Sequence, residues 1–132
     1  ETPEELSQFL LPLSEAGVDI FHCSQRRFWE PEFEGSDLNL AGWTRKITGK
    51  PAITVGSVGL NADFIPVPGE VTFREAEPAS LDELERRLSD NEFDLVAVGR
   101  ALISNPSWVD MVRDDRPDDI KPFRKEHLGQ LV

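Results

Sequence analysis

Residues 93 to 106 read FDLVAVGRALISNP, a short apolar run that ends abruptly in Gly99 and Arg100. A run of this length, rich in β-branched residues and bounded by glycine, is typical of a buried strand. Glycine lets the backbone approach a ligand closely, and the guanidinium group of arginine offers a planar set of donors to an oxyanion. The pair therefore suggests an anion held at the end of this strand.

A second apolar segment, upstream of the first, ends in the same way. AITV at 52–55 is nearly all apolar and runs directly into Gly56-Ser57-Val58-Gly59. Earlier in the chain, VDIFHCS at 18–24 is short, β-branched and aromatic, and it is predicted to be another strand. Three strands, at 18–24, 52–55 and 93–99, are therefore expected.

Helices are predicted between these strands. Thr2-Pro3-Glu4-Glu5 has the spacing of a capping box with proline at the first helical position, so a helix begins near residue 3, and Pro12 predicts a kink or an early end before Gly17. Residues 61–79 show no periodicity and are predicted to form a surface loop. Another helix is expected to begin near Asp37, and a second capping box at Ser80 to Glu83 predicts a helix whose charged face is solvated. A cap at Ser104-Asn105-Pro106 predicts a further helix, and a last one is expected near residues 124–131.

The alternation of helices and strands predicts an α/β fold with parallel strands. Strands without polar alternation are typical of sheets that helices cover on both faces. In parallel α/β folds, ligands lie beyond the carboxyl ends of the strands. The candidate positions are therefore those that follow the three strands, at 24–27, 56–59 and 99–100.

Two of these strand ends together predict a phosphate site. Backbone N–H groups and the hydroxyl of Ser57 would donate hydrogen bonds, and Arg100 would supply positive charge. The alternative is that Gly56 and Gly99 only permit tight turns from strand to helix, and that Arg100 pairs with a surface carboxylate. Agreement between two successive strand ends favours the phosphate site.

Composition restricts the partners. Fourteen basic and 25 acidic side chains give a net charge of −11, which opposes nonspecific binding to nucleic acid or to an anionic membrane surface. No apolar run approaches the roughly 20 residues that span a bilayer. Cys23 is the only cysteine, so no internal disulfide forms, and a cytoplasmic location is expected. The chain opens on a helix cap without an initiator methionine, which suggests a fragment of a longer protein.

VGSVGL at 55–60, followed by FDLVAVGRALISNP at 93–106, resembles the end of the Old Yellow Enzyme family, the NADH:flavin oxidoreductases, whose members are FMN-binding (β/α)8 barrels. The resemblance extends through GVDIFHCS at 17–24, FEGSDLNLAGWTRKITGKP at 33–51 and the tail, and so covers essentially the whole chain. It implies that residues 1–132 are the C-terminal portion of such a TIM-barrel domain, with strands six to eight and their helices.

The resemblance also implies roles for particular residues. Gly56 and Ser57 after the seventh strand, with Gly99 and Arg100 after the eighth, are expected to hold the FMN phosphate. NADH or NADPH would be the reductant, and the parent protein would reduce an activated alkene. The carbonyl-binding His/His or His/Asn pair and the proton-donating tyrosine of the family are expected upstream, and this chain contains no Tyr. The chain alone is therefore expected to be inactive.

The remaining histidine, cysteine, arginine and aromatic side chains are expected mainly to have structural roles. His22 is expected to point into packing, and Cys23 to be a small buried residue; neither they nor His127 has the spacing of a metal site or a triad. Arg26 and Arg27 are expected to pair with the acidic residues of the following loop, although they could also face the flavin. The aromatic residues of that loop, Phe28, Trp29 and Phe33, are open to three interpretations: a lid, a contact between subunits, or local packing.

Two other functions remain open at this point. One is a noncatalytic α/β interaction module whose acidic surface meets a basic partner. The other is a different phosphate-binding barrel enzyme, since this phosphate site recurs in barrels of unrelated chemistry. A three-stranded piece of a barrel would also leave sheet edges unpaired, so self-association through those edges is expected if the piece exists alone.

Overall fold

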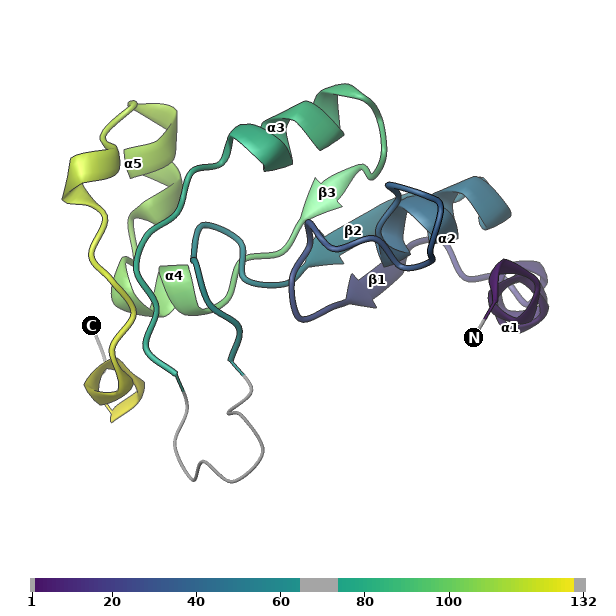
Figure 1. Cartoon of the computed structure of the whole chain (residues 1–132), viewed down its shortest axis with the longest axis horizontal. Coiled ribbons are helices and arrows are strands. Elements are labelled where there is room, and N and C mark those ends of the chain that lie inside the picture. The colour runs from purple at the N-terminus through teal and green to yellow at the C-terminus, as the bar shows by residue number, and fades with distance from the viewer. Residues whose placement is uncertain (1, 65–73, 130–132) are drawn as a thin grey trace. The chain divides into compact units, whose positions relative to one another are not determined.

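The structure, a computed structural model, describes residues 2–64 and 74–129. The chain forms two compact units, which are described separately. The first unit comprises residues 1–56 and 82–97, and the second comprises residues 57–81 and 98–132. Figure 1 labels the helices and strands of both. The prediction that residues 1–132 belong to one barrel domain stays a prediction.

A parallel sheet of three strands, in the order β1-β2-β3, forms the centre of the first unit. The strands are β1 (Phe21–Ser24), β2 (Ala52–Val55) and β3 (Leu95–Val96). Phe21 lies opposite Ala52 in the first pair, and Ile53 lies opposite Leu95 in the second. The predicted α/β fold with parallel strands is confirmed. The predicted strand at 93–99 is longer than β3, although Asp94 N and Ala97 N still donate to carbonyls of β2.

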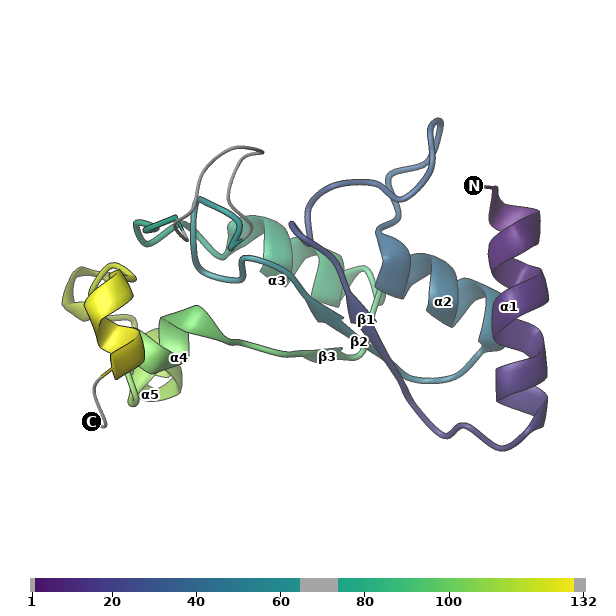
Figure 2. The ribbon, with the colours of Figure 1, turned by 90° about the horizontal axis from the view of Figure 1, so that it is seen from below.

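Three helices accompany this sheet: α1 (Pro3–Glu15), α2 (Leu40–Thr48) and α3 (Asp82–Ser89). Figure 2 shows α2 and α3 on the same side of the sheet. Phe21 and Cys23 of β1 are buried, whereas His22 and Ser24 are exposed, and Leu95 of β3 is 51% exposed. The expectation that helices cover both faces of the sheet is therefore wrong for the first unit. Because successive side chains of a strand point to opposite faces, one-sided cover produces this alternation in β1.

Local sequence signals explain where α1 and α2 begin and end. Thr2 N donates to the Glu5 carboxylate (2.9 Å) and Glu5 N donates to Thr2 Oγ1 (3.3 Å), which confirms the capping box. Helix α1 contains the exposed Pro12, which removes only one donor, and it ends at Glu15, before Gly17, as expected. Helix α2 begins after its N-cap Asn39 and ends at Gly49, whose φ of 66° is left-handed.

Short elements make up the second unit: α4 (Arg100–Ser104), α5 (Trp108–Arg113) and the 3-10 helices η1 (Pro117–Asp119) and η2 (Lys125–Gly129). Leu60, Trp108 and Phe123 are buried in its core. The expected cap at Ser104-Asn105-Pro106 is wrong, because Ser107 is the residue before α5 and the amide of Asn105 bonds instead to the backbone of Lys121. Only η2 occupies the predicted last helix.

The predicted surface loop at 61–79 falls partly outside the described residues, which omit 65–73. Two residues of its second described end, 74–79, form isolated bridges: Ala76 with Phe123, and Pro78 with Leu60, which precedes the loop. Within the described ranges, none of the helices has both the length and the apolar character required to cross a bilayer.

Candidate anion site

Two of the residues predicted to bind phosphate, Ser57 and Arg100, lie together in the second unit. Arg100 is the first residue of α4, and its Nη2 donates to Ala62 O (2.6 Å) and to Ser57 Oγ (3.3 Å). Ser57 Oγ also donates to Ala62 O (3.1 Å). A hydroxyl and a guanidinium that are 43 positions apart in the sequence are therefore direct neighbours.

The backbone at Ser57 is held in a conformation that is uncommon for a residue with a side chain. Its φ of 54° lies in the left-handed region, which costs about 1 kcal/mol or more for a residue other than glycine. Leu60 N donates to Ser57 O (3.0 Å) and closes the turn that imposes this conformation. The turn presents the Ser57 hydroxyl to Arg100.

The guanidinium of Arg100 is partly withdrawn from water. The ring centroids of Phe64 and Phe123 lie 5.6 and 5.4 Å from Arg100 Cζ. Burial lowers the pKa of Arg100, and the negative charge of Asp63, which is itself only 5% exposed, opposes that effect. Charge interactions are stronger in such a setting than at an open surface, because the local dielectric constant is lower.

One donor atom of Arg100 has no acceptor in the part of the chain that the structure describes. Its Nη1 is buried and has no hydrogen-bond partner among the described residues. The other terminal nitrogen, Nη2, donates to the neutral oxygens of Ser57 and Ala62. Among the described residues, Arg100 therefore does not form the ion pair with a surface carboxylate that the alternative interpretation expects. A buried cationic N–H without an acceptor is costly, and an oxyanion is the ligand that satisfies it best. The residues present therefore fit a phosphate group.

The two predicted glycines differ in what requires them. Gly56, in the first unit, has a φ of +146°, and a Cβ on it would lie 2.5 Å from Gln25 O. Close packing against the loop after β1, together with the positive φ, therefore explains Gly56 without any ligand. Gly99 precedes α4, and a Cβ on it would meet nothing within 4 Å. Neither observation tests phosphate binding by these two residues.

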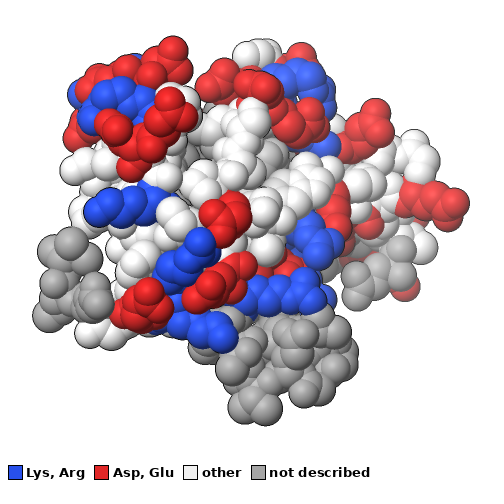
Figure 3. All heavy atoms as spheres, turned by 60° about the vertical axis from the view of Figure 1, so that its left-hand side comes forward, with Lys and Arg blue, Asp and Glu red and all other residues white. Residues whose placement is uncertain are grey.

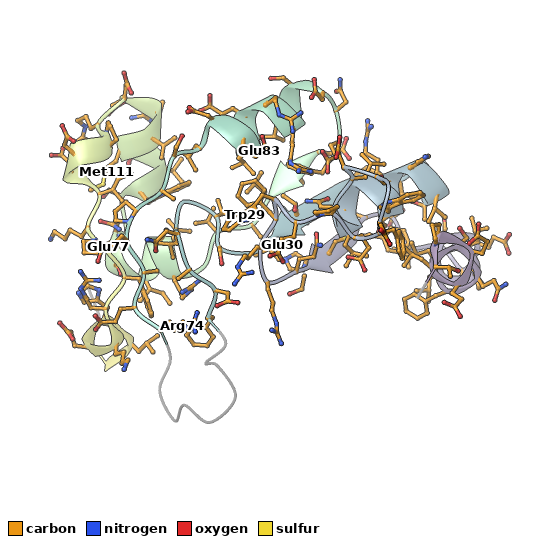
Figure 4. The ribbon with its side chains drawn as sticks, viewed as in Figure 1. Trp29, Glu30, Arg74, Glu77, Glu83 and Met111 are labelled. Carbon is orange, nitrogen blue, oxygen red and sulfur yellow. The ribbon has the colours of Figure 1, made fainter. Side chains whose placement is uncertain are left out.

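The loop between β1 and α2 makes contacts within itself and with the neighbouring α2. Arg27 pairs with Glu30 (2.6 Å), as expected of that arginine, and Arg26 is exposed. Figure 4 labels Trp29 and Glu30 on this loop. The ring of Phe28 packs edge-on against Trp29 at 5.3 Å, and Phe33 packs in the same way against Trp43 at 5.3 Å. These contacts favour local packing over a lid or a contact between subunits.

A buried ion pair in the first unit was missed by the sequence analysis. Arg87 of α3 is 4% exposed, and its Nη1 donates to Glu92 Oε1 (2.7 Å) and to Asp37 O (2.9 Å). Its Nη2 donates to Trp29 O (3.1 Å), and its Nε to Glu83 Oε1 (2.7 Å). The expectation of a fully solvated charged face on this helix is therefore wrong. The spacing of Glu83 and Arg87 by four residues was a signal for their pairing.

The Arg87 cluster is continuous with the cap of α2. Glu92 Oε1 accepts from Asn39 N (2.9 Å), and the fully buried Asn39 side chain donates to Phe28 O (2.9 Å) and Thr54 Oγ1 (3.0 Å). Asn39 Oδ1 accepts from Gly42 N (2.9 Å). These bonds tie the loop after β1 to β2 and α3, which is a structural role.

The remaining titratable residues show no catalytic arrangement. His22 is exposed, so the expectation that it points into packing is wrong; the neighbouring Phe21 and Cys23 take the buried face of β1. Cys23 is buried as expected, and burial raises the pKa of its thiol, which lies 3.4 Å from Thr44 Oγ1. His127 Nδ1 lies 2.8 Å from Ser104 Oγ. Within residues 2–64 and 74–129, no three His, Cys, Asp or Glu side chains are grouped for a metal ion.

Other polar surfaces carry paired charges. A groove of about 480 Å³ between α2 and α3 is lined by Arg45, Lys46 and Arg86 together with Asp37, Asp90 and Glu92. Arg45 pairs with Asp94 (3.0 Å) and Arg86 with Asp90 (2.8 Å), so the groove offers little uncompensated charge. On the face drawn in Figure 3, basic and acidic side chains are likewise interspersed. Arg100 is therefore a stronger candidate for binding an anion than this groove.

No protein-family model matches the chain. The chain is similar to the NADH oxidase of Thermoanaerobacter brockii, with 32% identity over 136 residues. The match covers 97% of this chain but 18% of that protein, so the chain spans less than a fifth of the length of the curated relative. The similarity is to part of an oxidoreductase, and the finer resemblance to the Old Yellow Enzyme family stays a prediction.

Proposed function

We propose that this chain is the part of an NADH-dependent flavin oxidoreductase that holds the phosphate of FMN. The observation that carries the proposal is the buried Nη1 of Arg100, which has no partner among the described residues and belongs to a guanidinium hydrogen-bonded to Ser57. The similarity to an NADH oxidase supports the proposed reaction class. The proposed phosphate ligands are Gly56, Ser57, Gly99 and Arg100.

Each proposed ligand would contribute a different interaction. Arg100 would supply positive charge and the donor Nη1, and its Nη2 is already oriented by Ser57 Oγ and Ala62 O. Ser57 would turn its hydroxyl from Ala62 O toward a phosphate oxygen. Gly56 and Gly99 would offer main-chain N–H groups, which bind phosphate without any side chain. Together these groups bind and orient the cofactor, and none of them takes part in the redox reaction.

The finer proposal is an oxidoreductase of the ene-reductase type. The chemistry that FMN would supply, when held by the proposed ligands, is hydride transfer from NADH or NADPH to the β-carbon of an activated alkene. The residues that bind the alkene carbonyl and supply the proton are proposed to lie outside this chain. The contribution of this chain would be affinity: a charge-assisted hydrogen bond between Arg100 and phosphate contributes more than a neutral one.

Flavin content of the full-length protein tests the proposal. We expect a yellow protein whose absorbance spectrum is that of FMN, and we expect Arg100→Ala to weaken FMN binding about 10- to 100-fold, since it removes a charged hydrogen bond from a partly buried site. Arg113→Ala is the matched control: it removes a guanidinium that is 67% exposed and already paired with Asp110 and Asp114. A full-length protein without flavin, or Arg100→Ala with unchanged FMN affinity, would refute the proposal.

A second candidate, a phosphate-binding barrel enzyme with a different ligand, rests on the same geometry. Ser57 and Arg100, which are hydrogen-bonded to each other, would recognise a phosphate group, and neither would contact an isoalloxazine ring in this role. This candidate predicts a colourless protein in which Arg100→Ala weakens binding of inorganic phosphate. Flavin that copurifies with the full-length protein and depends on Arg100 would exclude it.

A further inference from the structure

Aromatic side chains cover one side of the Arg100 guanidinium. Phe123 is completely buried, with its ring centroid 5.4 Å from Arg100 Cζ, and the Phe64 centroid is at 5.6 Å. The two ring centroids are 6.5 Å apart, at an interplanar angle of 65°. That separation is far shorter than the two distances to Arg100 combined, so the rings lie on neighbouring sides of the guanidinium rather than on opposite faces. The rings of Phe64 and Phe123 therefore lie next to each other beside the guanidinium.

The segment that carries Phe123 is fixed in position by its main chain. Phe123 N donates to Ala76 O (2.8 Å), and Ala76 N donates to Phe123 O (3.2 Å). Two residues earlier, Lys121 N donates to Asn105 Oδ1 (2.8 Å), and Asn105 Nδ2 donates to Lys121 O (2.9 Å). Such reciprocal pairs permit one register only, and a one-residue slip would break every bond in them.

An ion pair holds the next residue of the same segment. Arg124 Nη2 lies 2.6 Å from Glu77 Oε1, and Figure 4 labels Glu77 on the facing segment. Asn105 is only 2% exposed, so its amide is a buried polar group whose donors and acceptor are used on this segment and on α4. Polar groups on both sides of Phe123 therefore place its ring against Arg100.

A ring in this position restricts a side chain that is otherwise flexible. An arginine loses about 2 kcal/mol of rotamer entropy when it is immobilised, and a ligand must supply that free energy unless the protein has already done so. Nη2 is held by Ser57 Oγ and Ala62 O, and the ring centroids of Phe64 and Phe123 lie 5.6 and 5.4 Å from the guanidinium carbon. Nη1 is left as the donor for an oxyanion.

We infer that Phe123 is a positioning residue, which orients the Arg100 guanidinium for a phosphate group and thereby sets the affinity for phosphorylated over unphosphorylated flavin. The inference rests on the proposed function. Phe123 touches Arg100 and acts only through it. Phe64, which is 37% exposed, makes a smaller contribution of the same kind.

The test compares FMN with riboflavin, which has the same ring system and no phosphate. In the full-length protein, Phe123→Leu should weaken FMN binding about threefold to tenfold, the range of a cation–π contact at a partly buried site, and should leave riboflavin binding unchanged. Phe93→Leu is the matched control, because Phe93 is equally buried at 2% exposure and belongs to the first unit. It should change neither affinity.

A double-mutant cycle separates positioning from general loosening of the fold. Phe123→Leu should have no further effect on FMN binding in an Arg100→Ala background, since both changes remove the same interaction. If Phe123→Leu does not fold, Phe64→Leu replaces it, with about a twofold to threefold loss of FMN affinity expected.

The outcomes distinguish the two proposals. Equal losses of FMN and riboflavin affinity, additive effects in the cycle, or an unchanged FMN affinity would overturn the positioning role and leave the proposed function standing if Arg100→Ala still weakens FMN binding. A wild-type protein with no preference for FMN over riboflavin would overturn both.

Discussion

Replacing Gly56 with alanine should destabilise the protein more than any other glycine substitution at a positive φ in the first unit. The Cβ would lie 2.5 Å from Gln25 O, a main-chain atom that cannot rotate away, because Gln25 N bonds to Val55 O (3.2 Å) and Phe28 N bonds to Gly56 O (3.0 Å). The φ of +146° adds strain of about 1–3 kcal/mol, and displacing the loop adds about 1–3 kcal/mol. The expected loss in unfolding free energy is therefore about 2–6 kcal/mol.

Gly35→Ala is the matched control for this prediction. Gly35 has a φ of +79° with nothing within 4 Å of an added Cβ, so its substitution carries the backbone strain without the steric contact. Urea denaturation of wild type and both variants gives the unfolding free energies, and the difference between the variants reports the contact with Gln25 together with the less favourable φ of position 56. Equal losses in the two variants would refute the claim that Gln25 O determines the residue at position 56.

Three further predictions concern the first unit. Asn39→Ala should cost about 2–4 kcal/mol in urea denaturation, because it removes the cap of α2 and leaves buried Thr54 Oγ1 and Phe28 O without their donor. Hydrogen bonds from Arg86 and then Arg87 lower the pKa of Glu83 from 4.5 to about 2, so its stabilising contribution should be complete above pH 4.5 and be lost as the pH falls toward 2. The Glu83 side chain is 42% exposed, so its contribution to the unfolding free energy should be at most about 1 kcal/mol. In urea denaturation, Glu83→Gln should remove this pH-dependent part of the unfolding free energy. Cys23 should react with iodoacetamide slowly in the folded protein and rapidly in urea, because burial raises the pKa of its thiol; equal rates would contradict its burial.

The sequence predicted the fold wherever the signal was local. The capping box at Thr2 and the strand at 52–55 depend on residues a few positions apart, and both are confirmed. One-sided cover of the sheet depends on where distant helices pack, so the exposure of His22 was not predictable from an apolar run. The short helix α4 was also not predicted, because its N-cap, Gly99, has no side chain to form the capping hydrogen bond that marks a helix start.

In the candidate site, too, residues marked by a local sequence signal were predicted, and residues placed by long-range contacts were not. Ser57 and Arg100 were singled out because both follow strands, and their hydrogen bond agrees with that prediction of proximity. Phe123 was not singled out, because its contact with Arg100 depends on a bridge between Ala76 and Phe123 that joins two irregular segments. Asn105 was misassigned as a helix cap for a similar reason: an asparagine before a proline looks the same whether its amide faces a helix or a distant backbone.

Two arginines of this chain, Arg87 and Arg100, show what distinguishes a structural guanidinium from a candidate ligand-binding one. Arg87 is the more deeply buried, yet its Nε, Nη1 and Nη2 all have acceptors, two of which are carboxylates, so it needs no ligand. Arg100 is less buried, but its Nη2 has only neutral acceptors and its Nη1 has none among the described residues. Trp108 Nε1, in the same unit, also lacks an acceptor there, but an indole carries no charge and gains less from an anion. A phosphate group is therefore proposed at Arg100 because one of its charged donors has no acceptor among the described residues, whereas burial alone would have pointed to Arg87.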